Sequence, residues 1–301
     1  MTERMSEKPS GKATEKGKPK AVAKPAYAKL VKGYMGFLTG TGKSLSTISS
    51  YQGDLNLLEN FLAERKKDFY HLVPRDFEAY EYWLQNQGLK INTRRRKILS
   101  AKSLVKYAVS RKKMALSDVQ FVRAPERLER LPWIPLPKDW EKLKSALPKG
   151  TTLSLRNTLL VHMLAETGLT VAELCALRWD QLSGGETTLE IVGKHPRTLR
   201  LSEEVSSWLR EWREKNTGKH LFPGFNRHGV TSSKMTPRGV ELFFRQLAKA
   251  AGLKFLKPKT LRHFAIATWL SENIAENEIQ RRLGVHSNYS FDAYRKHLES
   301  R

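Results

Sequence analysis

The tyrosine at position 294 raises the clearest chemical question in the sequence. It lies in LGVHSNYSFDAYRKHL, residues 283–298, where Arg295 and Lys296 follow it directly. A tyrosine hydroxyl can act as a nucleophile that attacks a phosphate. Phe291 one turn before it and Leu298 one turn after it support the alternative, an aromatic side chain packed in a core. Spacing alone favours the packed aromatic.

Two further basic residues could act on a phosphate, and each has a structural alternative. Lys194 lies in GKHP, where a lysine is more often solvated than catalytic. Arg262 is followed by His263 in LRH, and the two could form a buried hydrogen-bonded pair. The one cysteine, Cys175 in LCAL, is expected to be a small core residue. No internal disulfide is therefore predicted, and a reducing compartment fits.

The charge of the chain predicts a polyanionic partner. The 301 residues include 54 Lys and Arg against 30 Asp and Glu, which gives a net charge of +24. Nucleic acid is the commonest partner of such a protein. No apolar stretch approaches the roughly 18 residues that span a bilayer, and residues 1–24 lack the apolar segment of a signal peptide. We therefore expect a cytoplasmic, nucleoid-associated protein that does not use a membrane.

The elements that must position these residues fall into two regions. Residues 1–24 have little to bury and predict a disordered basic tail. Residues 25–116 show four successive helical patterns and predict an all-helical domain. Residues 117–137 contain RAPERLERLPWIPLP and predict a semi-rigid, proline-rich linker. Residues 138–301 predict a second, mostly helical domain.

Several residues mark the expected helix ends in the first domain. The predicted helices cover 26–39, Ser46 or Thr47 to about Lys66, Pro74 to Gly88, and Asn92 or Thr93 to Lys113. In the second domain helices are predicted over 138–147, 153–166, 171–178, 202–215, 236–251, 259–272, 276–283 and 290–299. Two β-rich runs, 187–192 and 197–201, flank a turn with Gly193 and Pro196 and predict a hairpin. The fold class is thus mainly α with a small β-hairpin.

The fourth predicted helix is strongly basic. Nine of the residues 92–113 are Lys or Arg and none is acidic. At about 100° per residue, Lys102, Lys106 and Lys113 share one narrow stripe with Arg95, beside an apolar stripe. Such a helix is typical of one that contacts phosphates, although a solvated basic face is the alternative. The residues expected to contact DNA are Arg94, Arg95, Arg96, Lys102, Lys106 and Lys113.

Two sets of motifs resemble one known family. SLSTISSYQGDLNLLENFL, LVPRDFEAYEYWLQNQG and NTRRRKILSAKSLVKYAV resemble the core-binding domain of tyrosine recombinases, the phage integrase family. AETGLTVAELCALRW, VGKHPRTLRL, KTLRHFAIATWL and LGVHSNYSFDAY are similar to its catalytic domain, in the same order. The resemblance covers nearly everything from about residue 26 and implies a two-domain architecture, a helical core-binding domain followed by a mostly helical catalytic domain.

The resemblance also implies a reaction and the residues that perform it. The family's tyrosine attacks a DNA phosphodiester and forms a 3′-phosphotyrosine link, with no metal or nucleotide cofactor. Two arginines bind the non-bridging oxygens, and a lysine or histidine protonates the leaving 5′-oxygen. By position, Tyr294 matches the nucleophile, Arg262 the second arginine and Lys194 the general acid. Double-stranded DNA is the implied substrate, bound by a homo-oligomer or together with an active relative.

Three family positions differ in this chain. Thr170 stands in TGLTVAEL where the family has its first arginine. Lys259 stands where HxxR has its histidine, a softer change that keeps Lys259 a catalytic candidate, because a lysine can also donate to a phosphate. Val285 occupies the usual histidine position of LGH, and His286, one residue later, could replace it only if the backbone shifted. Loss of one preorganised donor typically costs ~10²–10³ in rate. The sequence therefore predicts a DNA-binding recombinase or integrase with impaired catalysis.

Two other functions fit parts of the pattern. A catalytically inactive member could keep the DNA-binding fold and act as an accessory or regulatory protein. A basic helical RNA-binding protein would also carry the charge, but the sequence has no aromatic-rich RNA-binding motif.

Overall fold

The computed structural model of the protein describes residues 25–115, 118–128, 133–226 and 229–300. The chain divides into two compact units, Met1–Glu129 and Arg130–Arg301. The division lies inside the segment predicted to be a linker. The predicted basic tail, residues 1–24, lies outside the described residues.

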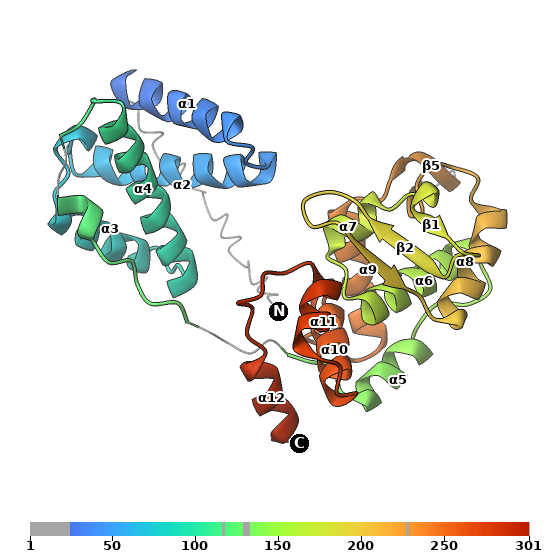
Figure 1. Ribbon diagram of the computed structural model, residues 1–301. Helices are drawn as coiled ribbons and strands as arrows, with labels where there is room; N and C mark the ends of the chain where they lie inside the picture. The colour runs from blue at the N-terminus through green and yellow to red at the C-terminus, as the bar shows by residue number, and fades with distance from the viewer. Residues whose placement is uncertain (1–24, 116–117, 129–132, 227–228, 301) are drawn as a thin grey trace, which may run out of the picture. The chain divides into compact units, whose positions relative to one another are not determined.

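The described part of the first unit is entirely helical (Figure 1). Its elements are α1 Pro25–Gly40, α2 Leu45–Glu64, the 3-10 helix η1 Phe69–His71, α3 Pro74–Asn86, α4 Ile91–Ser110 and the 3-10 helix η2 Asp118–Phe121. Large apolar side chains of α1 to α4 form one core, which includes Tyr34, Phe61, Tyr80 and Leu104. Their burial is the main favourable contribution to the stability of this unit.

The structure places two helix starts differently from the sequence prediction. Ser44, not Ser46 or Thr47, caps α2, because its hydroxyl accepts a hydrogen bond from the Thr47 amide. At α4 the N-cap is Lys90. Asn92 is not a cap because its side chain donates to the Leu128 carbonyl and accepts from the Leu128 amide, at 2.9 and 3.0 Å.

The segment after α4 packs against the first unit. Val119 in η2 is fully buried in the core of this unit, and Val122 and Ala124 contact it. Together with the Asn92 hydrogen bonds, these contacts hold residues 118–128 on the helical bundle rather than apart from it.

The second unit contains eight described α-helices, each within a range predicted from the sequence to within a few residues. They are α5 Pro137–Ser145, α6 Thr152–Thr167, α7 Val171–Ala176, α8 Glu203–Lys215, α9 Pro237–Ala250, α10 Pro258–Ser271, α11 Glu276–Leu283 and α12 Asp292–Glu299, with a 3-10 helix η3 at Trp179–Gln181. The helix α6 is buried on nearly every side and packs against α8 and α10.

Two small antiparallel sheets complete the second unit (Figure 1). The predicted hairpin is present as β2 Thr188–Ile191 and β3 Arg197–Arg200, with Leu189 opposite Leu199. The short strand β1 Leu182–Ser183 extends this sheet, and β4 Pro223–Asn226 pairs with β5 Gly229–Lys234. The strands β1, β4 and β5 are not predicted from the sequence, because their short runs lack a clear alternation.

Two apolar clusters position the candidate site. One is centred on α6 and contacts the sheet, α8 and α9. The other joins α10, α11 and α12 through residues that include Ile266, Trp269, Ile279, Phe291 and Tyr294. The carboxyl end of α11 is thereby held beside both α10 and α12.

Candidate active site

The packing of α12 on α10 fixes Tyr294. Its side chain is 4% exposed and belongs to the apolar cluster of α10, α11 and α12. The hydroxyl lies 2.5 Å from Nδ1 of His263 on α10 and 3.5 Å from the hydroxyl of Tyr289. The ring therefore packs in a core, as its spacing in the sequence favours, and its hydroxyl has a polar partner.

Burial determines the protonation of this pair. It raises the pKa of Tyr294, with a further increase from Tyr289, while the nearby Arg262 charge opposes the shift. Burial also lowers the pKa of His263 to about 4, helped by the positive charges of Lys259 and Arg262. Both side chains are neutral near pH 7, so the hydroxyl donates and the imidazole accepts.

Arg262 lies in the same region but points to backbone oxygens. Its guanidinium donates to the Gly168 carbonyl at 2.5 Å and to the Leu283 carbonyl at 3.0 Å. These oxygens belong to the carboxyl ends of α6 and α11, where unpaired carbonyls attract cations. Gly168 and Gly284 end these helices in the left-handed conformation, with φ of 61° and 62°. Burial lowers the pKa of Arg262, an effect that Glu173 opposes.

Thr170 is the N-cap of α7. Its hydroxyl accepts from the Glu173 amide at 3.2 Å and donates to the Glu173 carboxylate at 2.8 Å. The carboxylate in turn accepts from the Thr170 amide at 2.8 Å, which completes a capping box. Thr170 thus stabilises a helix and carries no charge toward a phosphate.

Arg197 on β3 is a residue of this region that sequence reasoning missed. Its side chain is 3% exposed, and Nη1 donates to Glu173 at 2.6 Å. Burial raises the pKa of Glu173, but the hydrogen bonds from Arg197 and Thr170 more than offset this effect and the pKa is lowered. The alternation along the strand indicates that Arg197 is buried, because it is in phase with the buried Leu199 and Leu201.

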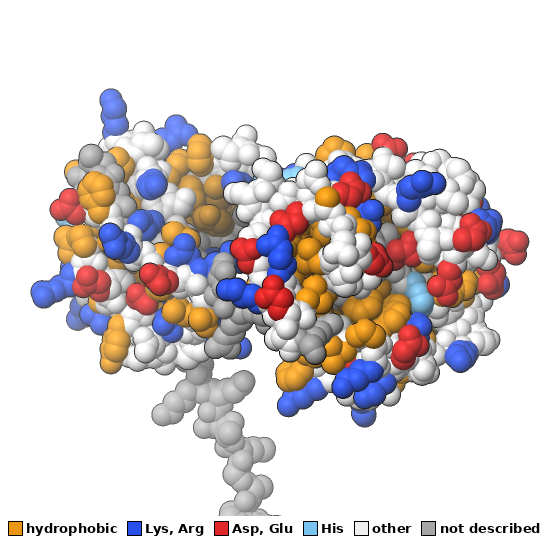
Figure 2. All heavy atoms as spheres, turned by 60° about the horizontal axis from the view of Figure 1, so that its bottom comes forward, with side chains coloured by type: hydrophobic (Ala, Val, Ile, Leu, Met, Phe, Trp, Pro, Cys, Tyr) orange, Lys and Arg blue, Asp and Glu red, His pale blue; other side chains and the backbone are white. Residues whose placement is uncertain are grey.

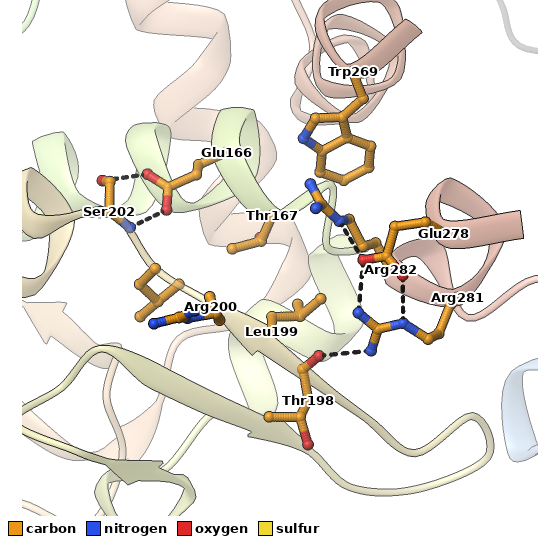
Figure 3. A pocket seen from close by; sticks show the side chains of 11 residues that line it. Glu166, Thr167, Thr198, Leu199, Arg200, Ser202, Trp269, Glu278, Arg281 and Arg282 are labelled. Atoms are coloured by element: carbon orange, nitrogen blue, oxygen red, sulfur yellow. Dashed lines mark hydrogen bonds and ion pairs between the residues drawn. The ribbon is translucent and has the colours of Figure 1, made fainter. Parts of the chain in front are cut away.

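Figure 3 shows how α11 is attached to β3 beside this site. Glu278 accepts from Arg281 at 2.7 Å and from Arg282 at 2.8 Å, and Arg281 also donates to the Thr198 carbonyl at 3.3 Å. These residues line a cavity of about 360 Å³ that does not include Tyr294 or Arg262. These hydrogen bonds hold the carboxyl end of α11 next to β3.

The other predicted catalytic residues lie at the surface. Lys194 is exposed in the turn between β2 and β3, and Lys259 is exposed in the first turn of α10, close enough to His263 to affect its pKa. His286 is exposed, and its ring lies edge-on to His195 with 6.0 Å between centroids. Val285 packs against the apolar cluster instead. The structure thus groups Tyr294, Arg262 and Lys259 around α10, and puts His286 near the hairpin turn.

The basic helix of the first unit uses several of its cations internally. Arg94 donates to the Leu89 carbonyl, Arg95 to the Pro125 carbonyl and Lys102 to the Val122 carbonyl. Arg96 and the buried Lys97 pair with Asp54 of α2, which is 1% exposed. The acidic partner of this helix is therefore Asp54 on another helix, and the sequence of residues 92–113 alone could not reveal it.

Exposure distinguishes the remaining predicted DNA contacts. Lys106 is exposed on α4, Arg96 keeps about half of its side chain exposed, and Lys113 is exposed beyond the helix end. The helix stops at Ser110 because Lys112 adopts a left-handed φ of 53°. On the face shown in Figure 2, Lys and Arg side chains are interspersed with Asp and Glu rather than gathered in one patch.

Two further properties concern only the described ranges. No group of three or more His, Cys, Asp or Glu side chains within them could hold a metal ion. None of their helices is long and apolar enough to cross a membrane.

Comparisons with known proteins bear on both units. Residues 136–301, more than half of the chain, match the model of the phage integrase family, and residues 31–112 match the phage integrase N-terminal SAM-like domain. Tyrosine recombinase XerC of Xylella fastidiosa (strain M23) is 27% identical over 281 residues, which cover 90% of this chain and 93% of the relative.

Solved structures share the fold. A lambda integrase dimer bound to a COC′ core site has a TM-score of 0.70 at 17% identity, covering 89% of this chain and 76% of that chain. A lambda integrase tetramer bound to a Holliday junction has a TM-score of 0.69 at 17% identity, covering 93% and 84%. The predicted mainly α, two-domain tyrosine recombinase architecture is confirmed. With both of its units matched by family models in order, the chain belongs to the phage integrase family.

Proposed function

We propose that this protein binds double-stranded DNA and acts on it as a site-specific recombinase or integrase through Tyr294, with impaired catalysis. The observation that carries the proposal is the contact of the Tyr294 hydroxyl with His263, the residue that follows Arg262. A nucleophile and a phosphate-binding guanidinium thereby share one region. Residues 25–116 would contribute DNA contacts and residues 138–301 the chemistry.

In this proposal the Tyr294 oxygen attacks a DNA phosphorus and the bond to the 5′-oxygen breaks. The tyrosine proton passes to a neutral base, for which His263 is positioned, and the leaving 5′-oxygen takes a proton from Lys194. Arg262 and Lys259 would stabilise the charge on the non-bridging oxygens. The phosphotyrosine link keeps the bond energy, so the reaction needs no cofactor.

Impaired catalysis is supported by the residues at the departed positions. The Thr170 hydroxyl is used to cap α7, and Val285 packs on an apolar cluster. The family's histidine donor is absent at position 285, and the next histidine, His286, lies against the His195 ring. In addition, burial raises the pKa of Tyr294 and lowers that of His263, so proton transfer between them is unfavourable in this enclosed arrangement. The Tyr294 side chain is also only 4% exposed, so its hydroxyl must become accessible before it can reach a DNA phosphate.

The second candidate is a catalytically inactive DNA-binding accessory or regulatory protein on the same fold. The same Thr170 and Val285 environments favour it. Either protein would act on cytoplasmic, nucleoid DNA, as a homo-oligomer or with an active relative. The sedimentation of the complex on a single duplex site measures which assembly forms.

A nicked duplex that carries the protein's own site tests the chemistry. The site is first found by selecting bound DNA fragments. We expect slow formation of a protein–DNA adduct that survives denaturing electrophoresis and is lost in Tyr294→Phe. Tyr289→Phe is the matched control, because it removes the neighbouring hydroxyl and should keep the adduct. Specific binding without any adduct would support the accessory protein, and the absence of DNA binding would contradict both functions.

A further inference from the structure

The guanidinium of Arg197 is buried but only partly hydrogen-bonded. Nε donates to the Arg282 carbonyl at 2.7 Å, and Nη1 donates to Glu173 at 2.6 Å and to the His195 carbonyl at 3.1 Å. Nη2 is enclosed and has no hydrogen-bond partner among the described residues. A buried donor without a partner destabilises the folded chain. Such a group is unusual and calls for a partner that the folded chain does not supply.

Glu173 links Arg197 to the position where the family's first arginine is missing. One carboxylate oxygen accepts from Arg197 and the other from the amide and hydroxyl of Thr170. The Arg197 guanidinium therefore lies one carboxylate away from Thr170. It brings a permanent positive charge to this end of α7, which threonine cannot do.

The carboxyl end of α11 links Arg197 to Arg262. Arg197 donates to the Arg282 carbonyl and Arg262 donates to the next one, that of Leu283. The two cations are close enough for the charge of Arg197 to lower the pKa of Arg262. Two guanidinium groups from β3 and α10 thus meet at one helix end, although 65 residues separate them in the chain.

Gly284 permits this close approach. A Cβ atom at this position would lie 2.8 Å from Nη1 of Arg197 and 3.0 Å from the His195 Cβ. Any larger residue would displace the guanidinium or the hairpin turn. The same glycine precedes Val285 and His286, so the buried arginine lies directly beside the segment in which the family places a catalytic histidine.

We propose that Arg197 supplies the second guanidinium that binds the scissile phosphate, in place of the arginine absent at position 170. The unpartnered Nη2 would donate to a non-bridging oxygen while Glu173 and the α11 carbonyl hold the rest of the group in place. Because Nη2 is enclosed, the groups that cover it must move aside when the phosphate enters. This inference rests on the proposed function, since it names a further ligand of the same phosphate.

The contact can be tested without catalysis by asking whether a side-chain substitution and the neutralisation of one phosphate affect binding independently. If they do not, the side chain and that phosphate are coupled. The full chain carrying Tyr294→Phe is titrated with duplexes of the selected site in which a neutral methylphosphonate replaces each phosphate in turn. We expect Arg197→Gln and Arg262→Gln each to weaken binding of the unmodified duplex ~10-fold or more. At one methylphosphonate position, the same for both variants, the loss should shrink to about twofold or less.

Two further variants separate a phosphate contact from a structural role. Arg200→Gln, on the same strand but exposed on its other face, is the matched control and should show no coupling at that position. Arg197→Gln leaves Glu173 without its partner, so the double variant Arg197→Gln with Glu173→Gln removes both charges together. We expect it to show the same coupling at an unfolding temperature close to that of the parent.

The outcomes are distinguishable. Coupling of Arg262 to a phosphate with no coupling of Arg197, in either the single or the double variant, would overturn the inference and leave the proposed function intact. If neither arginine couples to any phosphate, or if the parent protein does not bind duplex DNA, the proposed function fails and the inference fails with it.

Discussion

Thr170 is a good helix cap and a poor phosphate ligand, and these two properties exclude each other in one side chain. Its hydroxyl exchanges hydrogen bonds with Glu173 and starts α7. An arginine could reach a phosphate from the same backbone position but could not accept the Glu173 amide. A threonine at position 170 therefore stabilises α7, whereas an arginine there would supply catalytic charge at the expense of that cap.

The variant Thr170→Arg should raise activity and lower stability. A guanidinium at position 170 is expected to speed adduct formation on the nicked duplex by ~10²-fold at most, because Arg197 is proposed to supply part of the same charge. Loss of the cap should lower the free energy of unfolding by about 0.5–2 kcal/mol, measured by denaturant titration. Thr170→Ser, which keeps the cap and adds no charge, should leave both quantities near the parent values. A gain of rate in Thr170→Ser would contradict this explanation.

Two histidines with lowered pKa values, the buried His263 and the partly buried His162, are expected to make the second unit sensitive to acid. Burial lowers the pKa of His263 to about 4, and burial with the charge of Lys144 lowers the pKa of His162 to about 4 as well. The His162 ring packs edge-on against Trp140 and Trp208, with centroids 5.1 and 4.5 Å away. An unfolded histidine titrates near 6.5, so the unfolded chain binds protons first as the pH falls.

We therefore expect the stability of the second unit to be fully present above about pH 6.5 and to fall as the pH approaches 4. Thermal unfolding followed by tryptophan fluorescence between these pH values measures the loss. His162→Gln should flatten the dependence, because glutamine does not titrate. His71→Gln is the control, since that imidazole is exposed. An unchanged slope in His162→Gln would show that other groups cause the acid sensitivity.

At the scale of elements, α4 is a structural helix as well as a basic one. Asp54 on α2 accepts from Lys97 at 2.8 Å and Ser100 at 2.9 Å, and it also pairs with Arg96. The carboxylate and Lys97 are both buried, so each neutralises the other in the core of the first unit. A pair of this kind is costly to break from one side.

Asp54→Asn should destabilise the first unit by about 3–5 kcal/mol, because it leaves Lys97 buried without an opposite charge. Denaturant unfolding measures the change. Glu211→Gln, which breaks the exposed pair of Glu211 with Lys215, is the control and should cost about 0.5 kcal/mol or less. A loss in Asp54→Asn no larger than in this control would mean that Lys97 finds another partner or water.

At the scale of the whole molecule, the net charge of +24 governs binding more than fold. Affinity for duplex DNA is expected to fall steeply between about 50 and 200 mM salt, because each neutralised phosphate releases counterions. Accessible cations alone contribute to this effect. Lys106 is exposed on α4, whereas Lys102, one turn earlier, donates to the Val122 carbonyl and burial lowers its pKa.

The two lysines form a matched pair for this prediction. Lys106→Gln should reduce the slope of log affinity against log salt by about 0.9, the contribution of one phosphate contact. Lys102→Gln should leave the slope unchanged, because its ammonium group already has a protein partner. Binding isotherms at several salt concentrations measure both slopes. Equal slopes for the parent and Lys106→Gln would show that Lys106 does not contact a phosphate.

The order of the motifs, the helices of both units and the β2–β3 hairpin can all be predicted from local stretches of sequence. These features depend on local periodicity, caps and turn residues, which a short stretch of chain contains in full. The candidate residues Tyr294, Arg262 and Lys194 were found in the same way, from motifs of a few residues. The N-caps Ser44 and Lys90 and the helix end at Ser110 differ from the prediction, because side-chain partners and one left-handed lysine determine them.

Which of these groups meet, and which charges are accessible, depends on how the chain packs in three dimensions. The contact of Tyr294 with His263, the approach of Arg197 to Glu173 and the pairing of Asp54 with Lys97 join residues 24 to 43 positions apart. No local pattern encodes such distances, because they result from how the helices and the hairpin pack around a shared core. Burial then shifts the pKa values of Tyr294 and His263, and packing selects the cations that remain at the surface.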